Sequence, residues 1–387
     1  MRRFVAVLMA LIMITMLIVG CGNSGSPYAQ TTQRTENSRL SIVSTIFPQY
    51  DWVRQIMGER ADDVDLTLLI NNRIDMHSFQ PSVSDIVRVS TADMFIYVGG
   101  DSDWWVEDVL RQAVNPNMIV INLMEVLGDR AVYEEIVEGM QHDHDCDDDD
   151  DCDDPSHDHG PPYDHAHDHG HGSGQEHSHD HDDHDHDHDH DPGHDHTHTH
   201  DHSHDHHHGT LDEHVWLSLR NAVAFTVAIT EALSTLDPEH AELFRANLTQ
   251  YLNRLAELDA EYNEMVSAAS SRTLLFADRF PFRYLVDDYG IHYYAAFPGC
   301  SAETEASFTT IIFLAEKVDE LNLTTVMVTE SADEAIARTI ISNTASADQR
   351  ILVLDSMQSA NATDWQNGVT YLSIMERNLD VLREALG

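Results

Sequence analysis

The chain has 387 residues, of which 68 are acidic and 21 basic, so its formal net charge at pH 7 is −47 with neutral histidine. A surface this acidic argues against binding to nucleic acid and is compatible with concentrating cations. The four cysteines are too few and too scattered along the chain for a disulfide framework.

The N-terminal residues have the composition of a secretory signal. A basic segment over residues 1–4 precedes an apolar run of about 15 residues, which is too short for a comfortable transmembrane helix and typical of a signal peptide. The run ends in LIVGC at residues 17–21, which resembles the lipobox of bacterial lipoproteins. We therefore predict a signal peptide over residues 1–20, lipidation of Cys21 and a flexible tether over residues 21–40. An uncleaved anchor is the alternative.

Short β-branched segments then alternate with helical ones. Strands are predicted over residues 41–47, 64–70, 93–98 and 118–123, and helices over residues 50–57, 84–89 and 104–113. This alternation implies right-handed crossovers and a parallel sheet. We assign residues 41–236 to an N-terminal lobe.

A low-complexity segment over residues 141–208 interrupts this lobe. It holds 24 of the 28 histidines and 23 acidic residues, with no Lys or Arg. It has no Val, Leu, Ile or Met to build a core, so we expect a disordered loop. Neutral imidazole is a common transition-metal ligand, so the segment predicts metal capture, with an acidic solubilising linker as the alternative. Cys146 and Cys152 within it are candidates for a disulfide or a soft metal site.

The second half repeats the strand and helix pattern. After a helix over residues 219–233, Asp237 and Pro238 provide an N-cap and a first-turn proline for one long amphipathic helix, which we assign to residues 237–269. A C-terminal lobe over residues 270–387 follows, with strands at 273–276, 292–297, 325–328 and 351–354 and helices at 280–287, 308–320, 333–341 and 374–385. The predicted fold is α/β, with two lobes joined by this helix and a ligand site in the cleft between them.

Four histidines lie outside the His/Asp-rich segment. His77 lies in a polar loop after the second strand, and His214 follows the segment directly. Both occupy loops at helix starts, where a rigid scaffold presents functional side chains. His240 and His292 are expected to be solvated or structural, and Cys300, which stands alone in a loop, is expected to be structural.

Two motifs carry a resemblance to a known family. Residues 76–85, MHSFQPSVSD, match the pattern PH-x-[FY]-x-P-[ST]-x-x-D with Met in place of the first Pro, and residues 212–218, DEHVWLS, match DPHVWLS with Glu in place of Pro. The chain therefore resembles the cluster A-I solute-binding lipoproteins of ABC importers, which include the zinc-uptake binding proteins. The His/Asp-rich insert before the second motif is typical of the zinc-specific members.

The resemblance implies two (βα)4 lobes with parallel sheets, a backbone helix between them and a metal ion in the cleft. His77 and His214 match family ligands. The usual third ligand aligns with Arg279, which cannot bind a cation, so Asp278 is the replacement candidate, and Glu330 is the candidate for the carboxylate after a C-lobe strand. A helix N-terminal carboxylate is the alternative role for Glu330.

The implied function is the capture of Zn²⁺ outside the cytoplasm and its delivery to an ABC permease and ATPase. We expect a monomer that is lipid-anchored to the bacterial cell membrane and binds no nucleic acid. Zinc suits two imidazoles and two carboxylates, and Mn²⁺ or Ni²⁺ remains an alternative. A surface adhesin or metal buffer without a transport role is a further alternative. The sequence contains no HExxH motif, no G-x-S-x-G motif and no phosphate-binding glycine loop, so we do not expect an enzyme.

Overall fold

The computed structural model describes residues 39–71, 74–141, 210–301 and 305–387. The predicted signal peptide, the lipidation site Cys21, and Cys146 and Cys152 in the His/Asp-rich segment lie outside these residues. Within the described ranges, no helix combines the length and the apolarity needed to cross a bilayer.

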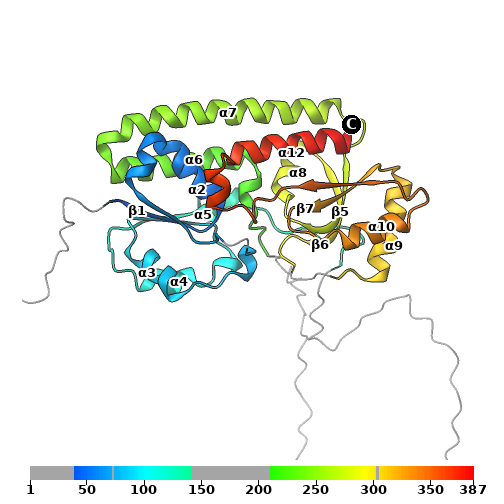
Figure 1. The fold of residues 1–387 in the computed structure, drawn as a ribbon, viewed down its shortest axis with the longest axis horizontal. Helices are drawn as coiled ribbons and strands as arrows, with labels where there is room; N and C mark the ends of the chain where they lie inside the picture. Colours follow the sequence, from blue (N-terminus) through cyan, green and yellow to red (C-terminus); the bar gives the residue numbers. More distant parts are fainter. Residues whose placement is uncertain (1–38, 72–73, 142–209, 302–304) are drawn as a thin grey trace, which may run out of the picture.

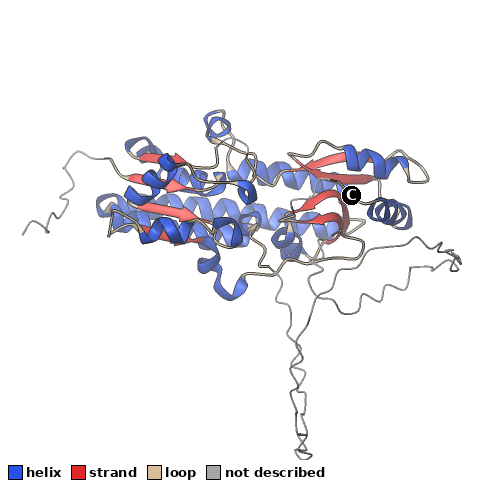
Figure 2. Ribbon diagram, turned by 90° about the horizontal axis from the view of Figure 1, so that it is seen from below, coloured by secondary structure: helices blue, strands red, loops and turns tan. Residues whose placement is uncertain are grey.

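Two parallel four-stranded sheets form the two lobes, side by side in Figure 2. The strands of the first sheet are β1 (Ser41–Ser44), β2 (Asp65–Leu68), β3 (Met94–Tyr97) and β4 (Ile119–Asn122), in the order β2-β1-β3-β4. Those of the second are β5 (Thr273–Phe280), β6 (His292–Pro298), β7 (Thr325–Thr329) and β8 (Arg350–Leu354), in the order β6-β5-β7-β8. The two lobes therefore have the same strand order, which confirms the predicted α/β fold of two similar lobes.

Helices cover both faces of the first sheet (Figure 1). They are α2 (Phe47–Met57), α3 (Val83–Thr91), α4 (Val106–Arg111), α5 (Leu123–Leu127) and α6 (Leu219–Leu236). The first strand is shorter than the predicted residues 41–47, because α2 begins at Phe47 with Pro48 in its first turn, where the missing N–H has no intrahelical partner to lose. The short helix α5 was not predicted from the sequence.

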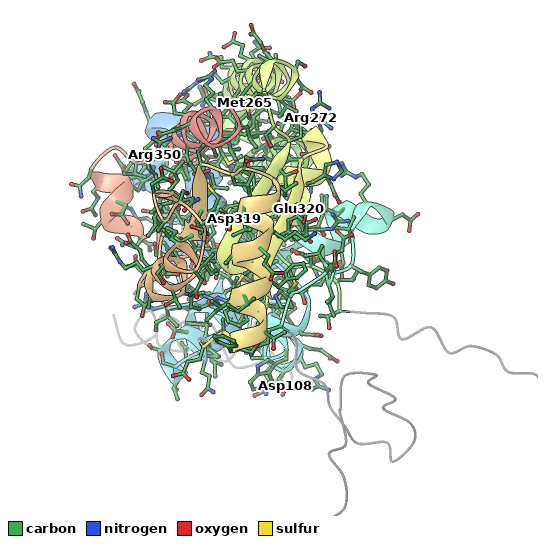
Figure 3. All side chains as sticks on the ribbon, turned by 90° about the vertical axis from the view of Figure 1, so that its right-hand side faces the viewer. Asp108, Met265, Arg272, Asp319, Glu320 and Arg350 are labelled. Carbon is green, nitrogen blue, oxygen red and sulfur yellow. The ribbon has the colours of Figure 1, made fainter. Side chains whose placement is uncertain are left out.

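The helices of the second lobe are α8 (Arg283–Tyr289), α9 (Phe308–Glu320), α10 (Ala335–Ser342), α11 (Ala362–Gln366) and α12 (Tyr371–Leu386). Viewed from the end of this lobe (Figure 3), α9, which carries Asp319 and Glu320, crosses in front of the sheet, and the helix that carries Met265 lies at the top. Helix α9 packs on β5 and β6, so the sheet is covered on the side that faces away from the first lobe.

Helix α7 (Ala241–Ala268) runs along both lobes (Figure 1). Its 28 residues span about 42 Å at a rise of ~1.5 Å each. One face is buried, with Tyr251, Leu255, Leu258 and Tyr262 against the lobes. The helix begins at Ala241 because Pro238–His240 form a 3₁₀ turn. It is the predicted backbone helix between the lobes.

The C-terminal residues return to the first lobe, which the sequence-based domain boundaries did not anticipate. The Trp365 indole N–H donates to Asp51 Oδ1 (3.2 Å), and the Tyr371 backbone N–H donates to Asp51 Oδ2 (3.0 Å). Asp51 lies in α2 and is fully buried. The lobes are therefore joined twice, by α7 and by residues 361–371, and one hydrophobic core continues through both connections.

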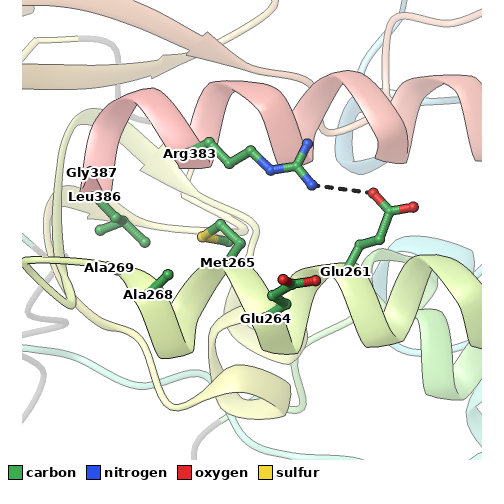
Figure 4. A pocket seen from close by; sticks show the side chains of 8 residues that line it. All are labelled: Glu261, Glu264, Met265, Ala268, Ala269, Arg383, Leu386 and Gly387. Carbon is green, nitrogen blue, oxygen red and sulfur yellow. Dashed lines mark hydrogen bonds and ion pairs between the residues drawn. The ribbon is translucent and has the colours of Figure 1, made fainter.

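Helices α7 and α12 lie side by side near the C-terminus (Figure 4). Arg383 Nη2 of α12 is 3.2 Å from Glu261 Oε2 of α7, and both side chains line a pocket together with Met265 and Leu386. No histidine or cysteine lines this pocket, so it offers none of the nitrogen and sulfur donors that transition metals prefer.

Candidate metal centre

His77 lies in a short 3₁₀ turn after β2, Met76–Ser78. Asp75 caps this turn, since its Oδ1 accepts from the His77 backbone N–H (3.0 Å). The ring Nδ1 of His77 lies 2.6 Å from Ser102 Oγ and 3.5 Å from Glu213 Oε2. Because these contacts orient the ring through Nδ1, the Nε2 atom remains available to bind a metal ion.

His214 is fully buried at the start of the 3₁₀ turn Val215–Leu217. Asp212 Oδ1 accepts from both the backbone N–H (2.8 Å) and the ring Nδ1–H (3.0 Å) of His214. A carboxylate accepts only, so Nδ1 carries the proton and Nε2 presents its lone pair. Gly299 lies against this ring: an added Cβ would be 3.0 Å from the His214 Cε1 atom and 2.9 Å from the Phe280 carbonyl oxygen. Any side chain there would displace the histidine or the backbone.

The Nε2 atoms of His77 and His214 point at each other across 3.3 Å. Two nitrogen ligands of a tetrahedral zinc ion, each at ~2.05 Å, would themselves be separated by about 3.3 Å. The observed separation therefore fits two ligands of one ion, and the polar groups at both Nδ1 atoms fix the two rings in that orientation.

Cys300 brings a third donor to this point. Among the described residues, one group of three or more His, Cys, Asp and Glu side chains has ligand atoms close enough to share an ion: His77, His214 and Cys300, all within 4.8 Å of one another. Cys300 follows Gly299 at the end of β6, and its backbone N–H donates to Glu134 Oε1 (2.8 Å). From the sequence we expected Cys300 to be structural, so its position beside the two histidines was not predicted. The signal available in the sequence was its position directly after a strand, at the carboxyl edge of a parallel sheet.

The surroundings give the two histidines different proton affinities. Burial and the nearby His214 lower the pKa of His77 to about 4. Burial alone would also lower the pKa of His214, but the charge and hydrogen bond of Asp212 outweigh it and raise that pKa above its usual value. At mildly acidic pH, a proton entering the pair therefore binds to His214.

The predicted carboxylate ligands lie outside this group. Asp278 Oδ2, in β5, accepts from the backbone N–H of Thr329 (3.1 Å) and from its hydroxyl. Glu330 accepts from the backbone N–H of Ser356 (2.8 Å), the Ser356 hydroxyl (3.0 Å) and the Ser359 N–H (3.2 Å). Both carboxylates connect strand ends within the second lobe, and the structure does not bring them together with His77 and His214.

The other residues singled out from the sequence have separate roles. Arg279 forms an ion pair with Asp75 across the cleft, with Nη1 2.5 Å from Oδ2. His240 Nδ1 lies 2.8 Å from Asp237 Oδ2 at the start of α7, and His292 is exposed at the start of β6. Neither histidine belongs to the three-donor group, in keeping with the expectation that they are solvated or structural.

Comparison with known proteins identifies relatives over most of the chain. It is 24% identical over 371 residues to the zinc-binding lipoprotein AdcA of Streptococcus pneumoniae strain R6, covering 95% of this chain and 58% of AdcA. It is 23% identical over 371 residues to the high-affinity zinc uptake system protein ZnuA of Bacillus subtilis, covering 96% and 94%. The chain spans a little over half the length of the AdcA relatives it matches.

Solved structures share the fold. The zinc-bound ZnuA-like domain of Streptococcus pneumoniae AdcA superposes with a TM-score of 0.59 at 23% identity, covering 90% of this chain and 99% of that one. The periplasmic zinc-binding protein TroA from Treponema pallidum superposes with a TM-score of 0.60 at 16% identity, covering 90% and 100%. Residues 42–385 match the model of the family described as zinc-uptake complex component A, periplasmic. As the two histidine motifs predicted, the chain belongs to this family.

Proposed function

We propose that this protein captures Zn²⁺ outside the cytoplasm and delivers it to an ABC importer made of a permease and an ATPase. The observation that carries the proposal is the pair of facing Nε2 atoms of His77 and His214, 3.3 Å apart, with both Nδ1 atoms held by polar partners. Zinc binds imidazole well, whereas Mn²⁺ lies low in the affinity order for nitrogen ligands.

The relatives support both the cargo and the transport role. The Bacillus subtilis relative is named a component of a high-affinity zinc uptake system, and the AdcA relatives are named zinc-binding proteins. The S. pneumoniae relative is named a lipoprotein, which supports lipid attachment at Cys21 and a location on the outer side of the cell membrane. We infer a monomeric binding protein rather than an enzyme.

Titration of metal-free protein with Zn²⁺ against a competing chelator tests the site. The His/Asp-rich segment is deleted to remove its histidines. His77→Ala and His214→Ala should each lower the affinity more than tenfold, which is more than ~1.4 kcal/mol. His240→Ala, which removes a histidine outside the donor group, should bind as tightly as the parent protein. Unchanged affinity in both site variants would place the zinc site elsewhere.

A transport assay tests delivery. A strain that lacks the gene should accumulate less zinc from zinc-poor medium, and the wild-type gene should restore uptake whereas the His214→Ala gene should not. Equal zinc accumulation with and without the gene would reject the transport role and favour a metal buffer or adhesin. Tight binding of Mn²⁺ or Ni²⁺ together with weak binding of Zn²⁺ would instead show that the transported ion is Mn²⁺ or Ni²⁺.

A further inference from the structure

The two histidines of the centre both come from the first lobe, and Cys300 is the contribution of the second. His77 follows β2 and His214 precedes α6, whereas Cys300 follows β6. The cysteine is only partly exposed, and its donor atom lies within 4.8 Å of the donor atoms of both histidines. A metal held by all three would therefore connect the two lobes at the carboxyl edges of both sheets.

The backbone around Cys300 is arranged to present this side chain. Gly299 allows the loop to pass against the His214 ring, where no Cβ fits. Glu134 Oε1 fixes the Cys300 N–H at 2.8 Å. These two constraints come from separate segments, and both position the residue relative to His214 rather than into the hydrophobic core.

The local charge favours a bound dication. Three carboxylates surround the donor atoms: Glu134 Oε1 accepts from the Cys300 N–H at 2.8 Å, Asp212 Oδ1 accepts from the His214 ring at 3.0 Å, and Glu213 Oε2 lies 3.5 Å from His77 Nδ1. A divalent cation between the thiol and the histidines would attract a thiolate and these carboxylates alike. The Arg279 side chain points to Asp75, so its positive charge is paired there.

We propose that Cys300 is the third protein ligand, so that the centre binds its ion through two imidazoles and one thiolate and selects thiophilic ions over Mn²⁺. This inference rests on the proposed capture function and specifies its cargo chemistry. On binding, the thiol releases its proton to solvent and the sulfur lone pair forms the metal bond, with no change in oxidation state. Zn²⁺ and Cd²⁺ accept such a sulfur ligand readily, whereas Mn²⁺ favours oxygen ligands.

The test uses residues 22–387, which lack Cys21, with Cys146→Ser and Cys152→Ser so that Cys300 is the one remaining thiol. Co²⁺ added as a spectroscopic probe should give the near-ultraviolet sulfur-to-cobalt charge-transfer absorption at one equivalent, which histidine and carboxylate ligands do not produce. Cys300→Ser should abolish this absorption. It should also lower Zn²⁺ affinity at least tenfold while Mn²⁺ affinity changes less than threefold, so the zinc preference falls.

The outcomes separate this inference from the proposed function. No charge-transfer absorption, together with zinc affinity within twofold of the parent in Cys300→Ser, would overturn the thiolate ligand while a large loss in His214→Ala still supported zinc capture. If neither variant loses affinity, the capture site itself is wrong. Should Cys300→Ser fail to fold, alkylation of the parent thiol decides: zinc should protect Cys300 from iodoacetamide, and equal labelling with and without zinc would contradict ligation.

Discussion

Arg279 Nη1 lies 2.5 Å from Asp75 Oδ2, so a single ion pair joins β5 of the second lobe to the turn that carries His77. The other oxygen of Asp75 accepts from the His77 backbone N–H. Both charged side chains are about four-fifths buried, and the charge of Arg279 lowers the pKa of Asp75 despite its burial. Arg279 thus holds, from the second lobe, the turn that carries the candidate ligand His77.

Removing this ion pair should make zinc release faster. In Arg279→Ala, Asp75 loses its partner, and breaking a partly buried pair leaves a charge that must find water or a proton. The turn then has fewer constraints, so we expect zinc dissociation into excess chelator to accelerate about tenfold. Arg338→Ala, which removes an exposed pair within α10, is the control. Identical release rates for all three proteins would show that the ion pair does not hold the turn.

The carboxylate behind His214 should contribute to zinc affinity without touching the ion. Asp212→Asn keeps the shape and one acceptor but removes the charge that orients and polarises the ring. Loss of such a partner typically costs ~10–100-fold in metal affinity, and we expect a loss in that range. The matched control is Asp237→Asn, which removes the same kind of partner from His240. An affinity unchanged in Asp212→Asn would mean that burial alone orients the ring.

Glu213 allows a second measurement of this kind on His77. It is 1% exposed and accepts from the Ser102 N–H through Oε1 (2.8 Å). Its Oε2 has no hydrogen-bond partner among the described residues and lies 3.5 Å from His77 Nδ1. Glu213→Gln should lower zinc affinity less than Asp212→Asn does, because Ser102 Oγ also contacts His77 Nδ1 at 2.6 Å. A larger loss in Glu213→Gln than in Asp212→Asn would mean that Glu213, rather than Ser102, is the main partner of His77.

Asp51 should make stability depend on pH in an unusual direction. Burial raises its pKa from 3.8 to about 6 in the folded protein, although the hydrogen bonds from Gln55, Tyr371 and Trp365 oppose this shift. The folded state therefore binds this proton more tightly than the unfolded state. Its contribution to stability is fully present below about pH 4 and is lost as the pH rises through 6.

The comparison with Asp51→Asn isolates this contribution. The free energy of unfolding of the variant, taken relative to wild type at each pH, should increase by ~3 kcal/mol between about pH 4 and pH 7, since a shift of about two pKa units corresponds to that energy. Denaturant titrations at several pH values measure it. Asp380→Asn removes an exposed carboxylate and controls for the change in net charge. A difference that stays constant with pH would show that Asp51 keeps its usual pKa.

The repeated sheets could be predicted because their signal is local. Short apolar and β-branched runs mark the strands, and apolar residues at helical spacing mark helix α7. The return of residues 361–371 to the first lobe could not be predicted, because its contacts depend on pairs such as Trp365 with Asp51, which are more than 300 residues apart. Periodicity carries no information on such long-range pairs.

The same difference between local signals and long-range contacts explains which parts of the candidate site could be predicted from the sequence. The motifs around His77 and His214 are short and contiguous, so both histidines could be proposed as ligands from the sequence, and the structure brings their Nε2 atoms together. The rest depends on contacts between separate strand ends: the register of β5 against β6 shifts between Phe276 and Arg279. Asp278 contacts Thr329 and Arg279 contacts Asp75, whereas the loop after β6 brings Cys300 to the histidines. An ungapped alignment cannot anticipate which neighbouring strand end supplies the donor.

The remaining prediction concerns the His/Asp-rich segment, whose two ends are fixed in the described part of the chain. Tyr133 and Leu211 form an antiparallel bridge, and the Glu134 N–H donates to the Thr210 carbonyl (2.9 Å). On the other side, the Gln141 N–H donates to the Ala296 carbonyl (2.9 Å) of β6. The segment therefore begins near the strand that leads to Cys300 and ends at the residues that lead to His214.

Replacing residues 142–208 by a short Gly-Ser linker should remove several weak zinc sites and keep one tight site. The composition of the segment predicts no packed core, so we expect each binding event there to cost conformational entropy and to be weak, whereas the candidate ligands of the centre are held by the two lobes. The thermal unfolding temperature should change little, because the hydrogen bonds at both ends of the segment remain. Isothermal titration of both proteins measures the number and affinity of the sites. If no tight site survives in the shortened chain, the segment itself is the zinc site and the centre at His77 and His214 is not.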